Sequence, residues 1–165
     1  MVQARVEKKD PEAILSLGTD YYQGARGLQK DMRRAVVLWT EAAEHGSIEA
    51  LFNLGVAYER GDGVGQDMAT ADDFYKKAAM QGHADSRYNL GWIEGQKGNH
   101  DRAVRHLLIS ANMGHKDSLD MIKDVFMEGL ATKEQYAQAL RGYQTAVEEM
   151  KSHDRDEAKR QGHGN

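Results

Sequence analysis

The chain has 165 residues, of which 40% are hydrophobic and 29% charged, a composition typical of one globular domain with a buried core. Its formal net charge of −4 at pH 7 gives no general attraction to nucleic acid or to an anionic membrane, because both bind basic surfaces. The absence of cysteine excludes disulfides, thiolate metal sites and a cysteine nucleophile.

The first helix of the predicted domain begins at Pro11, after a flank of residues 1–10. Asp10 is a capping acid, and proline suits the first turn of a helix. Pro11 is also the only proline, whereas the chain has 17 glycines. Because scarce proline permits long helices and regularly placed glycines divide them, this composition directs attention to repeats.

Two sequence patterns recur at a nearly fixed spacing. The tripeptides that end at Gly18, Gly55 and Gly91 all read Ser or Asn, then Leu-Gly, and these glycines lie 37 and 36 residues apart. A second pattern joins an alanine, an aromatic residue or leucine, a small pair and a glycine, and its four copies, the last of them fainter, are 36, 32 and 36 residues apart. The spacing predicts one domain over residues 11–150, with repeats at about 13–46, 50–82, 86–114 and 118–150.

Each repeat is predicted to form two helices. In the second repeat, Ala50, Leu54 and Tyr58 form a helical stripe, and Asp67 then caps a second helix that ends before Gly82. No stretch shows sustained alternation with period two, so no strand is expected. The predicted fold class is all-α, with eight antiparallel helices in four helix-turn-helix pairs stacked as an α-solenoid.

The last helix of the fourth repeat is predicted to begin at a capping box, residues 132–135. Its charged continuation suits a solvated helix that runs to about Lys159. Residues 151–165 are therefore expected to form a helical extension that ends in a frayed tail.

Glycine inside a helix costs about 1 kcal/mol relative to alanine, so three copies at one position need a physical reason. Gly18, Gly55 and Gly91 lack a Cβ and are expected to permit close approach of a second helix. Small residues on the second helices are the expected opposing surface, with Trp39 and Tyr75 supplying bulk around the seam. These small residues are Ala42, Ala43, Ala78, Ala79 and Ala111.

These residues resemble the Sel-1-like repeat, a relative of the tetratricopeptide repeat. Residues 50–82 match its pattern almost position for position, and 13–46 match nearly as well. Residues 86–114 match with a shortened loop, and 118–150 only in part, since Lys123 replaces the helix-interior glycine. The resemblance implies a right-handed α-solenoid that serves as a protein-interaction scaffold without catalysis.

The remaining motifs predict no catalytic residue, metal site or cofactor. Residues 61–65 are glycine-rich, but no strand precedes them and no lysine follows in place, so a turn between helices is expected. His100 and His106 would not share a helical face, which leaves no zinc clamp. His83 and His115 occupy equivalent positions and are expected at the turns between repeats. The sequence shows no pair of acids in an apolar setting and nothing that resembles a nucleophile elbow, so no hydrolytic activity is predicted.

The first helices carry the predicted binding face. Positions are counted from the alanine or serine that opens each first helix. Offsets 0, 4, 5 and 8 cluster within about 140° around the helix and are expected to form its packing face, whereas offsets 3, 6, 7 and 10 are expected on the opposite face. The resemblance places this opposite stripe in a concave groove. A groove that receives an extended or helical peptide is expected, with Trp92 central to it, unless Trp92 is buried by curvature or by the last helix. Its expected contacts are Asn53, Val56, Asn89, Trp92, Ile93, Met121 and Val125.

The expected function is therefore that of a non-enzymatic scaffold or adaptor with a protein or peptide partner. Two alternatives stay open: a structural spacer, and a module that forms oligomers by end-to-end stacking. No apolar run approaches the roughly 20 residues of a membrane helix, and the first residues lack a signal-peptide core. An intracellular, cytoplasmic location is expected.

Overall fold

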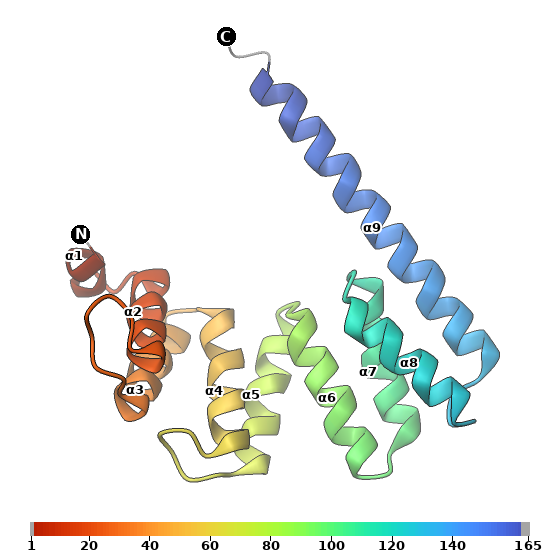
Figure 1. Cartoon of the computed structure of the whole chain (residues 1–165), viewed down its shortest axis with the longest axis horizontal. Coiled ribbons are helices and arrows are strands. Elements are labelled where there is room, and N and C mark those ends of the chain that lie inside the picture. Colours follow the sequence, from red (N-terminus) through yellow and green to blue (C-terminus); the bar gives the residue numbers. More distant parts are fainter. Residues whose placement is uncertain (1, 163–165) are drawn as a thin grey trace. The chain divides into compact units, whose positions relative to one another are not determined.

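The computed structural model describes residues 2–162, apart from the side chains of Val2, Gln3 and Glu7, and over that range it is all-helical, with nine helices and no strand (Figure 1). The helices are α1 (Val2–Glu7), α2 (Pro11–Gln23), α3 (Met32–Glu44), α4 (Ile48–Arg60), α5 (Met68–Met80), α6 (Ala84–Gln96), α7 (His100–Asn112), α8 (Lys116–Met127) and α9 (Lys133–Gly162). The predicted all-α fold class is confirmed; the eight predicted helices correspond to α2–α9, and α1 is an additional helix within the predicted flank of residues 1–10. Within the described range, every helix is too short or too polar to cross a bilayer.

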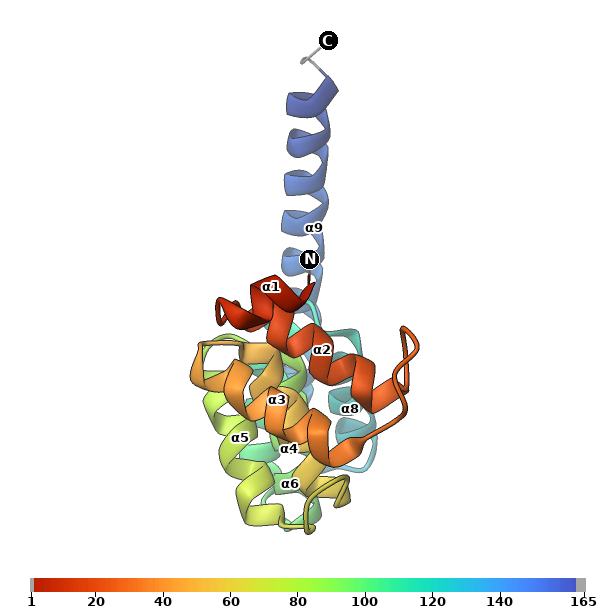
Figure 2. The same ribbon diagram turned by 90° about the vertical axis from the view of Figure 1, so that its left-hand side faces the viewer.

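The chain divides into two compact units, Met1–Ser86 and Arg87–Asn165, and the boundary falls within α6. In the first unit, α1 packs on α2, α2 on α3, α3 on α4 and α4 on α5 (Figure 2). In the second unit, α7 packs on both α8 and α9, which also pack on each other. In the first unit each helix therefore packs on its neighbour in the sequence, whereas in the second unit α9 also packs on α7, which is not its neighbour.

The helices begin at the capping residues that the sequence indicates. The Asp10 carboxylate accepts hydrogen bonds from the amides two and three residues later, at 3.0 and 3.3 Å, and Asp67 does the same at 3.0 and 3.1 Å. The Thr132 amide donates to Gln135 Oε1 at 2.8 Å, and the Gln135 amide donates to Thr132 Oγ1 at 3.1 Å. This reciprocal pair is the predicted capping box, and α9 runs beyond the expected Lys159 to Gly162.

The turns that lead into α4, α6 and α8 use one structural position, occupied by Ser47, His83 and His115. Ser47 Oγ accepts from the amide three residues later at 3.3 Å, and Nδ1 of each histidine accepts from the corresponding amide at 3.2 Å. Because Nδ1 accepts, the ring proton of the neutral imidazole lies on Nε2, which in His83 faces Glu49 Oε2 at 3.1 Å. The predicted role of both histidines at turns is confirmed: they cap helices.

The helix-interior glycines make room for large side chains rather than for the small pairs. A Cβ at Gly18 would lie 2.8 Å from Cδ1 of Trp39, and one at Gly55 would lie 2.5 Å from Cε1 of Tyr75. At Gly91 the neighbour is a leucine, Leu107, whose Cγ would be 2.9 Å away. The close approach is confirmed, but its predicted partner is wrong.

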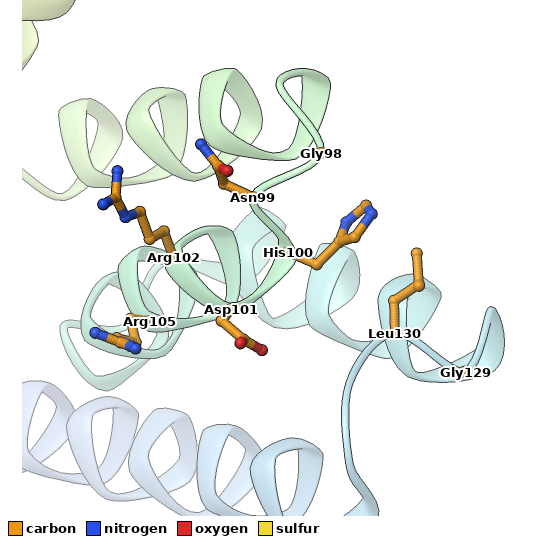
Figure 3. Close-up of a pocket in the computed structure, with 8 residues that line it drawn as sticks. All are labelled: Gly98, Asn99, His100, Asp101, Arg102, Arg105, Gly129 and Leu130. Atoms are coloured by element: carbon orange, nitrogen blue, oxygen red, sulfur yellow. The ribbon is translucent and has the colours of Figure 1, made fainter.

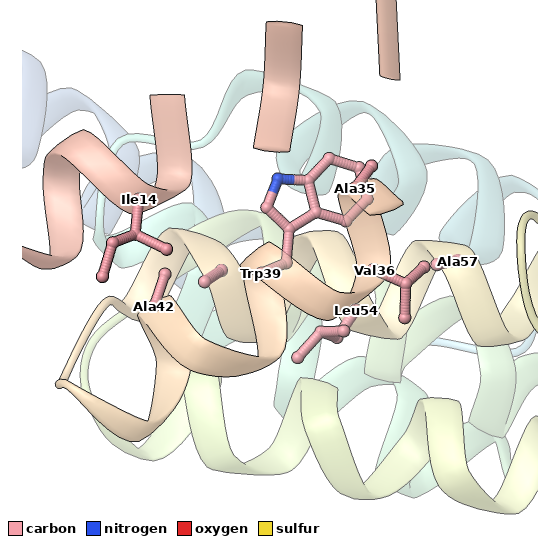
Figure 4. Packing of buried hydrophobic residues seen from close by; sticks show 8 residues of the cluster. Ile14, Ala35, Val36, Trp39, Ala42, Leu54 and Ala57 are labelled. Carbon is pink, nitrogen blue, oxygen red and sulfur yellow. The ribbon is translucent and has the colours of Figure 1, made fainter. Parts of the chain in front are cut away.

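The small pairs lie about one turn further along the second helices, beyond the point of closest approach. Ala42 is fully buried in the cluster with Ile14, Trp39 and Leu54, which joins α2, α3 and α4 (Figure 4). Small side chains at this position therefore let the following hairpin pack closely. Ala78, Ala79 and Ala111 are likewise buried, and Ala43 is half-buried.

Candidate functional site

A pocket of 310 Å³ opens in the first unit, and α2 and α4 supply most of its lining. Half of the lining residues occupy offsets 3, 6 and 10 of the first helices, which belong to the predicted stripe. The apolar lining is Tyr22, Trp39, Phe52, Val56 and Ala57, and the polar lining is Thr19, Gln23, Asn53, Arg60 and Asp62.

The aromatic part of the pocket follows from the packing of rings on glycine. Because Gly18 has no side chain, the Trp39 indole of α3 reaches across α2 and is only 4% exposed. Tyr22 lies one turn beyond Gly18 and contacts this indole, with ring centroids 5.5 Å apart. The repeat core thus supplies an aromatic wall to the pocket.

The polar groups of the pocket are mostly without partners in the described part of the chain. Thr19 Oγ1 donates to the Leu15 carbonyl at 3.0 Å. The carboxamides of Gln23 and Asn53 make no hydrogen bond with any described residue. Arg60 and Asp62 likewise make no ion pair there. Donors and acceptors in this pocket are therefore available to a ligand.

Offset 7 does not belong to the exposed stripe. In the first three repeats Asp20, Ala57 and Ile93 occupy it and are 7%, 2% and 4% exposed, whereas Val125, at offset 7 of the fourth repeat, is half-buried. Seven residues turn a helix to within about 20° of two full turns, so offset 7 lies beside offset 0 on the packing face. The expectation that these three residues lie opposite that face is wrong, and Ile93 is a core residue rather than a groove contact.

The other expected contacts of the second unit lie on α6 and α8. Trp92 is 41% exposed, whereas Asn89 and Val125 are half-buried. Met121 is also half-buried and packs against the cluster that contains Ile122. Trp92 is therefore the most exposed of the expected contacts in this unit.

A larger hollow of 650 Å³ in the second unit lies beside the turn between α6 and α7 (Figure 3). His100 points to the side of Leu130, whereas Arg102 and Arg105 point away from it. Arg102 also lies 3.8 Å from the Glu94 carboxylate. Because these cations do not converge on one point, the hollow does not form an anion site.

Glu94 stabilises that same turn as a buried, ionised carboxylate. Burial alone would raise its pKa, but hydrogen bonds from Asn99 and Lys97 and the charges of Lys97 and Arg102 outweigh burial and hold the pKa below its ordinary value of 4.5. The Asn99 side chain donates to Glu94 Oε2 at 2.9 Å, and Lys97 Nζ donates to Oε1 at 3.3 Å. Glu94 therefore has a structural role here.

Residues 61–65 form the turn that connects α4 to α5, as the sequence predicts. Gly61 and Gly63 have φ of 75° and 74°, values that favour glycine. Gly63 lies directly against the Met32 carbonyl, at the start of α3. Within the range that the structure describes, no three histidine, aspartate or glutamate side chains are grouped to hold a metal ion.

Comparison with known proteins identifies the repeats. A family model described as "Sel1 repeat" matches residues 11–47, 48–83 and 84–115. Each matched segment contains one helix pair, α2–α3, α4–α5 or α6–α7. The matches end before the predicted fourth repeat, whose helices are α8 and α9.

Curated relatives share the repeats over a small part of their length. The chain is 35% identical over 72 residues to "ERAD-associated E3 ubiquitin-protein ligase component HRD3B" of Arabidopsis thaliana, covering 44% of this chain and 12% of that protein. It is 28% identical over 109 residues to "Chitin synthase regulatory factor 3" of Schizosaccharomyces pombe, covering 63% of this chain and 12% of that protein. The chain thus spans about an eighth of the length of these relatives.

Solved structures match most of the chain. An SLR-fold protective antigen of uropathogenic Escherichia coli, c5321, aligns with a TM-score of 0.76 and 31% identity over 90% of this chain and 32% of that one. A Sel1 repeat protein from Oxalobacter formigenes aligns with a TM-score of 0.76 and 25% identity over 89% of this chain and 62% of that one. Three matched repeats and these two alignments show that the chain belongs to the Sel1 repeat family.

Proposed function

We propose that this chain is a non-enzymatic protein-interaction adaptor that binds a segment of a partner protein along its first helices. Family membership supports an adaptor, since relatives with these repeats are named as a component of a ubiquitin ligase and as a regulatory factor of chitin synthase. A repeat array of this kind offers an extended surface to a partner.

The observation that carries the proposal is the pocket between α2 and α4. Sequence periodicity together with the family resemblance predicts Asn53 and Val56 as contacts, and both line this pocket. Concave hollows with apolar walls and a few unpaired polar groups are where proteins bind ligands. In the second unit, we propose Asn89, Trp92, Met121 and Val125 as further contacts.

Val56→Arg tests the pocket directly, because the new side chain fills the hollow and adds a charge. Val37→Arg is the matched control, since Val37 is 66% exposed on α3 and does not line the pocket. Proteins bound by the wild type and by Val37→Arg should be lost with Val56→Arg in quantitative affinity capture. Purified candidates then give the dissociation constants.

Trp92→Ala provides the corresponding test in the second unit, and circular dichroism checks that each variant keeps its helix content. A partner set that survives both Val56→Arg and Trp92→Ala unchanged would refute binding at the first helices.

A further inference from the structure

We infer that the partner segment binds the pocket of the first unit in an extended conformation, with one large uncharged side chain in the pocket and its backbone hydrogen-bonded to Gln23 and Asn53. This inference rests on the proposed function and specifies the form of its ligand. The sequence alone leaves extended and helical peptides as alternatives.

The size of the pocket favours a single anchoring side chain. Its 310 Å³ lies at the lower end of ligand pockets, which hold roughly 300–1,000 Å³. A bound helix places anchors at positions i, i+3 or i+4 and i+7, which span about 10 Å along its axis. One compact hollow accommodates only one such anchor, which an extended segment can supply without the further anchors of a helix.

The unpaired carboxamides favour an extended backbone. Gln23 and Asn53 each offer a donor and an acceptor, and neither is used by a described residue. A helical ligand satisfies its interior backbone groups internally, so it offers these side chains little to bind. An extended segment has free N–H and C=O groups, which a carboxamide can pair with simultaneously.

The chemistry of the lining defines the anchor. Tyr22, Phe52 and Val56 are apolar, and Arg60 and Asp62 carry opposite charges at the pocket. Because these two charges offset each other, the pocket has no net preference for a charged side chain. The anchor is therefore aliphatic or aromatic, of the size of leucine, methionine or phenylalanine.

The experiment uses the full chain and a phage-displayed library of random 12-residue peptides. Enriched peptides are synthesised, and their dissociation constants are measured with the wild type, Val56→Arg and the control Val37→Arg. A peptide that loses binding only with Val56→Arg occupies the pocket. For such a peptide, replacing the anchor with alanine should weaken binding by about tenfold or more.

Backbone recognition is tested by a double-mutant cycle. Each peptide N–H is N-methylated in turn, and the cost is compared between the wild type, Asn53→Leu and Gln23→Leu. We expect one N-methyl group to weaken wild-type binding by up to about tenfold and to have little further effect in one carboxamide variant, since the same hydrogen bond is already lost. Gln29→Leu, at an exposed glutamine outside the pocket, is the control.

The outcomes separate this inference from the proposed function. If N-methylation costs the same in the wild type and in both carboxamide variants, the extended backbone contact is refuted, while pocket binding stands. If no enriched peptide depends on Val56, pocket binding and the inference are both refuted.

Discussion

Replacing Gly55 with valine tests the packing of rings on glycine. A Cβ at this position would lie 2.5, 2.6 and 3.0 Å from Cε1, Cδ1 and Cζ of Tyr75, whereas carbon atoms favour about 3.5–4.0 Å. Tyr75 is fully buried, and its hydroxyl donates to Glu59 Oε2 at 2.5 Å, so its ring has little freedom to move aside. Overpacking of this kind costs about 1–3 kcal/mol, which is the expected loss in the free energy of unfolding.

The matched control is Gly95, in the last turn of α6. A Cβ there would lie 3.9 Å from the Cβ of Ala103, an ordinary contact, so Gly95→Ala should raise stability by up to about 1 kcal/mol through helix propensity. Urea unfolding followed by circular dichroism measures both variants. A neutral or stabilising effect of Gly55→Val would refute the close-approach account.

Three further predictions concern capping, the buried indole and acid stability. His83→Ala removes the acceptor for an α6 amide and should cost about 1 kcal/mol in urea unfolding, whereas His83→Ser should recover most of that loss; equal stability of both variants would contradict the cap. Trp39→Phe should cost well below the roughly 3–5 kcal/mol of a core Trp→Ala change, because the indole N–H has no hydrogen-bond partner among the described residues; a loss in that range would be inconsistent with an unpaired N–H. Because folding lowers the pKa of Glu94 below 4.5, the stabilisation by its carboxylate is present above that pH and is lost as the pH falls through the lower folded-state pKa. The wild type should therefore lose more free energy of unfolding on acidification than Glu94→Gln, and equal losses would exclude this linkage.

Local features of the fold were predictable because their signals are local. Asp10, Asp67 and the capping box at residues 132–135 bind amides two or three residues away, so their sequence spacing is also their spatial arrangement. The equivalence of His83 and His115 follows from the repeat in the same way. The repeat also made the structural role of the helix-interior glycines predictable, since three copies at one helical position indicate a shared constraint.

Packing between helices could not be predicted in the same way. Which side chain lies over Gly18 depends on where α2 and α3 cross, and the sequence does not give that crossing point. The free carboxamides of Gln23 and Asn53 depend likewise on what surrounds them in space. The wrong assignment of Ile93 has a different cause. At 100° per residue, offset 7 lies only about 20° from offset 0 around the helix, so helix geometry alone places Ile93 on the packing face.

We propose that the first helices present a surface open to a partner, and the fluorescence of Trp92 tests this proposal. In Trp39→Phe, Trp92 is the only tryptophan, because the chain has two. Because Trp92 is 41% exposed, its emission should be red-shifted and readily quenched by acrylamide. A blue-shifted emission that resists quenching would show that Trp92 is covered, and it would contradict an open binding surface on α6.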